Sequence, residues 1–282
     1  MMRRGWRWGW GVAGLIVLGL ALWGFCIEPA SLRVTRSTLV LERWPRDLDG
    51  LRIAVLADLH VGSPFNGVDK LARVVAETNA AGADLILLVG DYVIKGVLGG
   101  TFVPPEVVAA RLHELRAPLG VYAVLGNHDW WLDAPRMRTA LEQAGIRTLE
   151  DQALAIDGPR HFWLVGVSDF WEGRHDVHAA LSGVRDDASV IAFTHNPDVF
   201  PHVPDRVTLT IAGHTHGGQV WLPIVGRPIV PSEYGQRYAI GHVVEGHRHL
   251  FVSPGLGTSI IPVRFRVPPE ISVVTLRGAE GR

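Results

Sequence analysis

Residues 51–60 read Leu-Arg-Ile-Ala-Val-Leu-Ala-Asp-Leu-His, an almost unbroken apolar run that ends in the polar side chains of Asp58 and His60. The run over 51–57 predicts a buried strand, because short apolar runs of this length are typical of strands covered on both faces. Residues two apart in an extended segment point the same way, so Asp58 and His60 can reach one common point. The same combination of an apolar strand and a polar end recurs along the chain and predicts the fold.

Polar clusters follow four further apolar segments. They are Gly90-Asp91 after 84–89, Gly126-Asn127-His128-Asp129 after 121–125, Thr194-His195-Asn196 after 189–194, and Gly213-His214-Thr215-His216 after 207–212. Because sites of α/β proteins assemble at strand ends, we expect the clusters to converge at one edge of the sheets. The glycines at 90, 126 and 213 permit tight turns and a close approach of the backbone there.

Helical periodicity alternates with these strands in the first half of the chain. Helices are predicted over 68–81, 104–115 and 135–144. After Thr148 the segments are mostly short strands, at 161–167, 189–194, 207–212, 219–222, 250–253 and 271–276. We therefore expect an α/β fold in which a second sheet packs on the first.

The polar clusters contain the residue types of a metal centre. Asp, His and Asn without cysteine suit divalent ions such as Mn²⁺, Fe²⁺, Zn²⁺ or Co²⁺, of which we expect Mn²⁺ first. The candidate ligands are Asp58, His60, Asp91, Asn127, His195, His214 and His216. Seven ligands are too many for one ion, but with one bridging carboxylate they fit two metals about 3.5–4 Å apart. The other histidines are expected on the surface or in structural positions.

The N-terminal region predicts a membrane anchor. No residue between Arg7 and Glu28 is charged, and the run over 8–27 is 20 residues long, about the length of a bilayer-spanning helix. A cleaved signal is the alternative, but 23–27 (Trp-Gly-Phe-Cys-Ile) is a poor cleavage site. A buried core helix is a second alternative. We predict an uncleaved tail and anchor over 1–29 and one domain over 30–282.

Charge gives the expected orientation and excludes one class of partner. Three arginines precede the apolar run, and the short N-terminal tail usually decides topology, which favours the N-terminus inside and the domain outside. With 27 Lys and Arg against 28 Asp and Glu, the net charge is −1, so no nucleic-acid partner is expected. The single cysteine, Cys26, excludes an internal disulfide. The sequence leaves the oligomeric state open.

The five polar clusters, taken in this order, resemble the five sequence blocks of the calcineurin-like metallophosphoesterases over about residues 51–276. The stretch 213–223 (Gly-His-Thr-His-Gly-Gly-Gln-Val-Trp-Leu-Pro) and the stretch 255–259 (Gly-Leu-Gly-Thr-Ser) are similar to a bacterial branch with an N-terminal membrane segment or export signal. That branch resembles UDP-2,3-diacylglucosamine pyrophosphohydrolases of lipid A synthesis and includes envelope phosphodiesterases.

The resemblance implies a four-layer αββα sandwich, with two mixed sheets flanked by helices, preceded by one transmembrane helix. It also implies roles for the polar residues: Asp58, His60 and His216 on one metal, Asn127, His195 and His214 on the other, Asp91 bridging both, and His128 as the catalytic residue that protonates the leaving oxygen or stabilises phosphoryl charge. Protein phosphatases of the superfamily carry an aspartate where this chain has Ile94, which argues against that branch. The residue that orients His128 is left open between Asp129 and Asp169.

The implied function is that of a membrane-anchored phosphohydrolase of the bacterial inner membrane. It would cleave phosphodiester or pyrophosphate bonds of a phosphate-ester substrate, including lipid-linked ones, by a hydroxide that bridges the metals. UDP-2,3-diacylglucosamine is one candidate, but it lies on the cytoplasmic side, so either the predicted topology or this substrate is wrong. A general envelope or nucleotide phosphodiesterase is an alternative, and a catalytically inactive membrane scaffold is an alternative of another class.

Two further stretches are candidates for contact with the substrate or the membrane. Trp130 and Trp131 follow the Gly-Asn-His-Asp cluster directly and can line an apolar entrance, with ordinary packing as the alternative. The stretch 223–231 is expected to be a plain loop, with a membrane-facing surface as the alternative.

Overall fold

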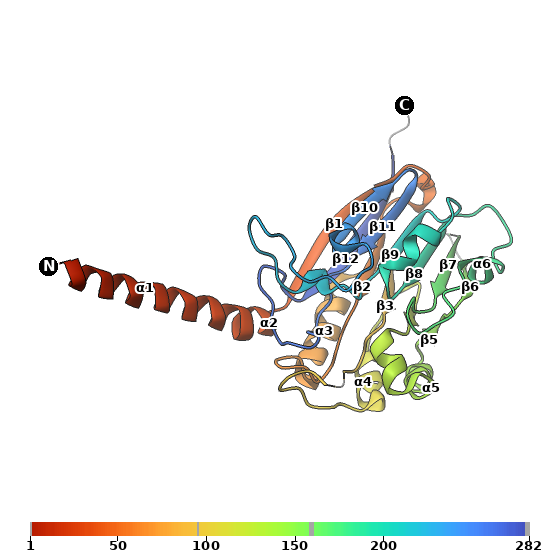
Figure 1. Ribbon diagram of the computed structural model, residues 1–282. Coiled ribbons are helices and arrows are strands. Elements are labelled where there is room, and N and C mark those ends of the chain that lie inside the picture. The colour runs from red at the N-terminus through yellow and green to blue at the C-terminus, as the bar shows by residue number, and fades with distance from the viewer. Residues whose placement is uncertain (1, 95, 158–160, 280–282) are drawn as a thin grey trace.

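The computed structural model describes residues 2–94, 96–157 and 161–279 and shows a mixed α/β fold with two sheets at its centre (Figure 1). The first sheet has the strand order β1-β12-β2-β3-β4-β5. Its strands are β1 (Arg33–Leu41), β2 (Leu51–Leu56), β3 (Leu85–Val89), β4 (Val121–Val124), β5 (Arg147–Thr148) and β12 (Glu270–Gly278). The second sheet has the order β10-β11-β9-β8-β7-β6. Its strands are β6 (Gln152–Ile156), β7 (Phe162–Val167), β8 (Val190–Thr194), β9 (Leu209–Ala212), β10 (Gly241–Glu245) and β11 (Arg248–Val252).

Both sheets are mixed, and their central strands are parallel. In the first sheet β2, β3, β4 and β5 run parallel, while β12 is antiparallel to β2 and parallel to β1. In the second sheet β7, β8, β9 and β11 run parallel, with antiparallel strands β6 and β10 at the two edges. Parallel neighbours bring their carboxyl ends to one edge, which is the requirement for the polar clusters to meet.

Helices cover the outer faces of the sheets. The α-helices are α1 (Met2–Leu22), α2 (Glu28–Ala30), α3 (Val68–Ala81), α4 (Pro105–Leu112), α5 (Asn127–Gln143) and α6 (Val177–Leu181). A π-helical turn, η1 (Trp23–Ile27), joins α1 to α2. The 3₁₀ turns are η2 (Arg46–Leu48), η3 (Pro197–His202), η4 (His216–Gly218) and η5 (Gly235–Tyr238).

Alternating side chains of each strand build a core on each side of the sheet. In β2, Ile53 and Val55 pack between the two sheets, whereas Ala54 and Leu56 pack beneath α3, α4 and α5. In β8, Phe193 faces the first sheet and Ala192 faces the outer cluster that includes α6 and η3. The layers are therefore helix, sheet, sheet and helix, which confirms the expected αββα sandwich.

Several expected elements differ in the structure. The predicted strand over 219–222 is wrong, because those residues form only isolated bridges, from Val220 to Phe265 and from Leu222 to Gly226. The strand over 271–276 was expected in the second sheet, but as β12 it lies in the first, between β1 and β2. Strands β1, β5, β6 and β10 were not predicted.

Helix α5 begins eight residues earlier than predicted, at Asn127. Its backbone is non-helical at Asp133, with φ −176° and ψ 84°, two residues before Pro135. A proline inside a helix removes one hydrogen bond and its ring clashes with the carbonyl four residues earlier, so the kink follows from Pro135. The predicted helix over 135–144 corresponds to the segment after this kink.

The N-terminal helix leaves the domain and extends away from it (Figure 1). In the described part of the chain, Trp10–Ala30 is long and apolar enough to cross a membrane, with a mean hydropathy of 2.1 over its best window. Only 6% of that window is buried inside the protein. A helix in the core of a soluble protein would be mostly buried. The N-terminal helix is exposed, so it is not a core helix of that kind.

We predict that the packing between the sheets carries much of the stability. Phe193→Ala removes a fully buried ring from the inter-sheet core and is expected to lower the free energy of unfolding by about 3–5 kcal/mol. The measurement is urea unfolding of the full chain in detergent, followed by circular dichroism. The control is Phe102→Ala, which removes an exposed ring and is expected to change stability by less than about 0.5 kcal/mol. Equal losses in both variants would contradict the assignment of this core.

Candidate metal centre

The polar clusters converge where the carboxyl ends of the parallel strands meet. Asp58 and His60 follow β2, Asp91 follows β3, and Asn127 opens α5 directly after β4. From the second sheet, His195 follows β8, and His214 and His216 follow β9. All seven side chains are buried, with exposed fractions of 4% or less. The structure thus brings together every residue that the sequence nominated as a metal ligand.

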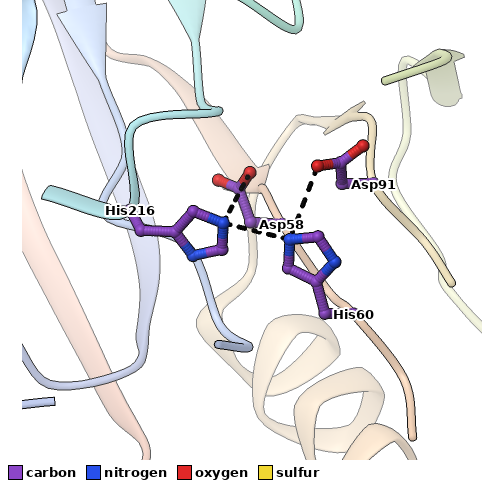
Figure 2. A group of neighbouring side chains, drawn as sticks. All are labelled: Asp58, His60, Asp91 and His216. Atoms are coloured by element: carbon purple, nitrogen blue, oxygen red, sulfur yellow. Dashed lines mark hydrogen bonds and ion pairs between the residues drawn. The ribbon is translucent and has the colours of Figure 1, made fainter. Parts of the chain in front are cut away.

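The first group of donor atoms comes from Asp58, His60, Asp91 and His216, whose side chains point toward one another (Figure 2). One donor atom from each lies within 4.8 Å of every other. The Nε2 atom of His60 is 3.0 Å from Nε2 of His216 and 3.4 Å from Oδ2 of Asp91. Oδ1 of Asp58 lies 3.7 Å from Nε2 of His216. This spacing is what several ligands around one ion require.

The second group shares Asp91 with the first. Its members are Asp91, His195 and His214, again with donor atoms within 4.8 Å of one another. Nε2 of His195 lies 3.3 Å from Oδ2 of Asp91, 3.0 Å from Nδ1 of His214 and 3.0 Å from Oδ1 of Asn127. The carboxylate of Asp91 therefore stands between two clusters of donors, as a bridging ligand would.

The chemistry of the donors fits divalent cations. Burial lowers the pKa of His60 to about 3 and lowers the pKa values of His214 and His216 well below their usual range, so these imidazoles are neutral and offer lone pairs. The buried space therefore contains many lone pairs and few protons. The lone pairs belong to neutral imidazoles, an amide oxygen and carboxylates that face one another. Such a cluster needs positive charge, and a divalent ion in each group would supply it.

The carboxylates show the same demand for positive charge. Burial raises the pKa of Asp58 to about 7, and the negative charge of Asp91 adds to this rise. Burial by itself would lower the pKa of His195, but the neighbouring carboxylate of Asp91 outweighs it and raises that pKa to about 10. The Asp91 carboxylate thus calls for a positive charge beside it, which a bound cation would supply. The other ring nitrogen of His195 lies 2.8 Å from the carbonyl oxygen of Val89, which fixes the ring so that Nε2 faces the cluster.

The backbone at the ligands is in an uncommon conformation. Five of the seven candidate ligands have positive φ: Asp58 at 49°, His60 at 40°, Asp91 at 58°, His214 at 68° and His216 at 52°. The left-handed region is sparsely populated by residues other than glycine, and such residues concentrate at functional sites. The preceding glycines are needed for space as well. A Cβ atom on Gly126 would collide with the carboxylate of Asp91, and one on Gly90 would lie 2.6 Å from the nitrogen of Gly126.

Asp129 holds the strand ends together instead of orienting His128. Its carboxylate accepts the backbone N–H groups of Asp91 at 2.8 Å, Tyr92 at 3.0 Å and Gly126 at 2.9 Å. Asp169 is the other candidate that the sequence left open. It is buried, and its negative charge partly opposes the lowering of the His128 pKa that burial causes.

A cavity of about 400 Å³ opens over the cluster. Its floor contains Asp91, Asn127, His128, His214 and His216. Its sides include the stacked rings of Trp131 and Trp171. They also include apolar side chains from the loops after β9 and β11, namely Val220, Ile229, Ile260, Ile261 and Val263. The cavity thus combines a polar floor with apolar sides.

Sequence reasoning found part of this cavity. Trp131 lines it, as anticipated, whereas Trp130 packs against the core beneath α5 and does not line it. Trp171 and the apolar loop residues were missed, because they belong to irregular segments without a motif. The available signal was the number of isoleucines and valines in the proline-flanked stretches 223–231 and 260–263.

Comparison with known proteins gives one family. The profile of the family described as calcineurin-like phosphoesterase matches residues 51–218. The chain is 31% identical to an uncharacterized metallophosphoesterase, YkuE of Bacillus subtilis, over 89% of this chain and 87% of that protein. It is 34% identical to the phosphodiesterase YaeI of Escherichia coli, over 80% and 82% of the two chains. It is 24% identical to the UDP-2,3-diacylglucosamine pyrophosphatase LpxG of Chlamydia trachomatis, over 90% and 92%.

We predict that Asp91 is required for both metals. Asp91→Ala removes the carboxylate common to the two donor groups, so the variant is expected to lose bound metal from about two ions per chain to none. Metal is counted by mass spectrometry after the full chain is loaded with Mn²⁺ and desalted. Asp157→Ala removes an exposed carboxylate outside the cluster and is expected to keep the full metal content. An Asp91→Ala protein that keeps both ions would contradict the bridging position.

Proposed function

Because the chain belongs to the calcineurin-like phosphoesterase family and is a hydrolase of phosphoester bonds, we propose that it is a membrane-anchored, two-metal enzyme acting on lipid-linked phosphodiesters or pyrophosphates. One observation carries the proposal: the cavity over the donor cluster has a polar floor and apolar walls. The floor suits a phosphate group, and the walls suit an apolar substituent attached to it.

The proposed centre holds two ions, for which we favour Mn²⁺. Asp58, His60 and His216 would hold one ion, and Asn127, His195 and His214 the other, with Asp91 shared. Two bound ions would lower the pKa of water and neutralise the charge of the phosphate oxygens. The chain contributes fixed donors to this arrangement. His195 is held by the Val89 carbonyl, and the backbone N–H of His214 donates to both oxygens of Asp58 at 3.0 and 3.1 Å.

His128 is the proposed catalytic residue. It lies on the cavity floor, and its backbone N–H donates to Oδ1 of Asp91 at 2.9 Å, which fixes it beside the cluster. Its ring contacts the edges of His60 and Trp131, with centroid distances of 4.8 Å in both cases. A histidine in this place can donate a proton to the leaving oxygen of the substrate, while the ions held by the seven residues would bind the phosphate oxygens.

The proposed substrates are amphiphilic. The N-terminal helix would hold the cavity at a membrane, and the similarity to LpxG makes UDP-2,3-diacylglucosamine one candidate. We propose that the N-terminus is inside and the domain outside the bacterial inner membrane, on the charge argument given above. In that orientation the substrate is a lipid-linked ester of the outer face, whereas hydrolysis of UDP-2,3-diacylglucosamine requires the domain on the cytoplasmic side.

We expect His128→Ala to separate metal binding from catalysis. The variant is predicted to keep its metal content and to lose about 10²–10⁴-fold in kcat, the usual contribution of a general acid. Both quantities are measured on the same sample, with bis-p-nitrophenyl phosphate as the substrate. The matched control is His178→Ala on the exposed side of α6, which is expected to change neither. Loss of metal from His128→Ala would show that His128 is a ligand and overturn the assignment.

Substrate class is tested on the full Mn²⁺-loaded chain in detergent. We expect hydrolysis of bis-p-nitrophenyl phosphate, and a higher kcat/KM for a diester that carries an acyl chain, because the apolar walls then contribute binding. UDP-2,3-diacylglucosamine is assayed in parallel, and its turnover would require the cytoplasmic orientation. Equal kcat/KM values for acylated and non-acylated diesters would contradict the lipid-linked substrate and leave the hydrolase assignment intact.

A further inference from the structure

Exposed isoleucine and valine side chains gather at the tips of the two loops that wall the cavity. In the loop 223–231, Ile224 is fully exposed, at 106% of its reference area, and Ile229 is 78% exposed. In the loop 259–263, Ile260 is 74% exposed. Single exposed apolar residues are common on protein surfaces, but large ones concentrated on neighbouring loops indicate a binding surface.

Two of these side chains also occupy unfavourable backbone positions. Ile224 has φ 73° and Ile260 has φ 61°. For a β-branched residue the left-handed region is a genuine outlier, and glycine or asparagine would adopt it at lower cost. Packing in the core does not explain the choice, because Ile224 points into solvent and Ile260, which lines the cavity, is also largely exposed. Strained residues of this kind concentrate at functional sites, so an apolar side chain at each tip points to a role in binding.

Both loops are fixed to the residues around the metal cluster. The Arg227 side chain donates to the carbonyl oxygen of Gly217 at 2.7 Å, directly after the ligand His216. The Gln219 side chain, three residues after His216, accepts the N–H of Ser259 at 2.7 Å, so it fixes the second loop to the segment that follows the cluster. These hydrogen bonds hold the tips in a fixed position relative to the cavity.

The same side of the domain receives the N-terminal helix. The carbonyl oxygen of Gly24 accepts the N–H of Arg264 at 2.9 Å, and the buried carboxylate of Glu28 accepts the N–H of Val267 at 2.6 Å. The segment 264–267 continues the loop 259–263, so the helix end and the exposed tips are parts of one connected surface. Figure 1 shows these blue-toned loops on the side of the domain from which α1 leaves.

We propose that the loops 223–231 and 259–263 insert their apolar tips into the surface of the membrane that the N-terminal helix crosses. The partner is a lipid bilayer, and the proposal rests on the membrane anchoring proposed above. Apolar side chains of this kind bind at the boundary between headgroups and acyl chains. The exposed guanidinium of Arg266, which lies over the ring of Trp221 at 4.4 Å, adds a positive charge suited to anionic headgroups. The mouth of the cavity then faces lipid instead of bulk water.

The test places a fluorescent label at one loop tip. Cys26→Ala removes the single native cysteine, and Ile224→Cys then provides one site for bimane. The full chain is reconstituted into vesicles of phosphatidylethanolamine and phosphatidylglycerol and recovered by flotation. Dibrominated phosphatidylcholine in the vesicles is expected to quench the label at position 224, and iodide in the buffer is expected to leave it unquenched.

The control is Val244→Cys on β10, an apolar side chain that is also exposed, at 53%. Val244 is three residues from His247, whose ring is hydrogen-bonded to Glu42. Glu42 directly follows the last residue of β1, and the N-terminal helix precedes the first residue of that strand, so the control site lies at the far end of β1 from the helix. The label at 244 is expected to be quenched by iodide and not by the brominated lipid. If iodide quenches both labels in vesicles that carry the protein, the proposed docking surface is wrong, whereas the proposed membrane anchoring stands. A chain that does not float with the vesicles would overturn the anchoring and the docking together.

A second measurement uses activity and leaves the cavity unchanged. Ile224 and Val225 do not line the cavity, so Ile224→Asp with Val225→Asp is expected to keep the rate on bis-p-nitrophenyl phosphate. With an acylated diester embedded in the vesicles, KM is expected to rise about tenfold, because two apolar contacts with lipid are lost. An unchanged KM on the embedded substrate would contradict the docking surface.

Discussion

The buried group of carboxylates and imidazoles is the constraint on which the rest of the structure depends. Burying such groups without a counter-charge is costly, and here six of them lie in one space at the junction of two sheets. The fold meets part of this cost with backbone donors: His214 donates to Asp58, His128 donates to Asp91, and Asp129 is held by three N–H groups. The remaining charge is left for cations. Both sheets contribute ligands, so a shift of one sheet against the other would separate the two donor groups.

The left-handed backbone at the ligands follows from this constraint. A strand that ends at a sheet edge carries its last side chains outward, and a turn of positive φ redirects them toward a common point. The turns are fixed to one another by hydrogen bonds: Asp58 N–H to Gly90 O at 3.1 Å, His60 N–H to Asp91 O at 2.8 Å, and Gly213 N–H to His195 O at 2.9 Å. Each turn therefore stabilises the strained conformation of the next. Strain of this kind persists only where the surrounding structure over-determines it.

The sequence predicted the parts of the molecule that repeat a local rule. The helix over 68–81 has the predicted bounds, and the strands before each ligand cluster agree to within two residues, because continuous apolar runs and ligand-bearing turns are local signals. Strand β12 was placed in the wrong sheet, since pairing between residues far apart in the chain leaves no trace in either segment. Trp171 and Ile229 were missed for a related reason. They reach the cavity from irregular loops whose course depends on tertiary hydrogen bonds, so periodicity carries no information about them.

The buried residues Glu28 and Arg264 link the N-terminal helix to the candidate metal ligands within one short loop. Glu28 accepts the N–H of Val267, and the Arg264 guanidinium donates to the carbonyl oxygens of Val267 at 2.9 Å and Gly257 at 2.6 Å. Burial lowers the pKa of Arg264 to about 10, so the guanidinium stays charged at neutral pH and requires these carbonyl partners. The N–H of Gly257 in turn donates to the carbonyl oxygen of Asp58 at 2.7 Å. A rotation of the helix relative to the domain would break this series of hydrogen bonds and disturb the loop that supports Asp58. The orientation of the cavity toward the helix and the position of the candidate ligand Asp58 are therefore set by the same interactions.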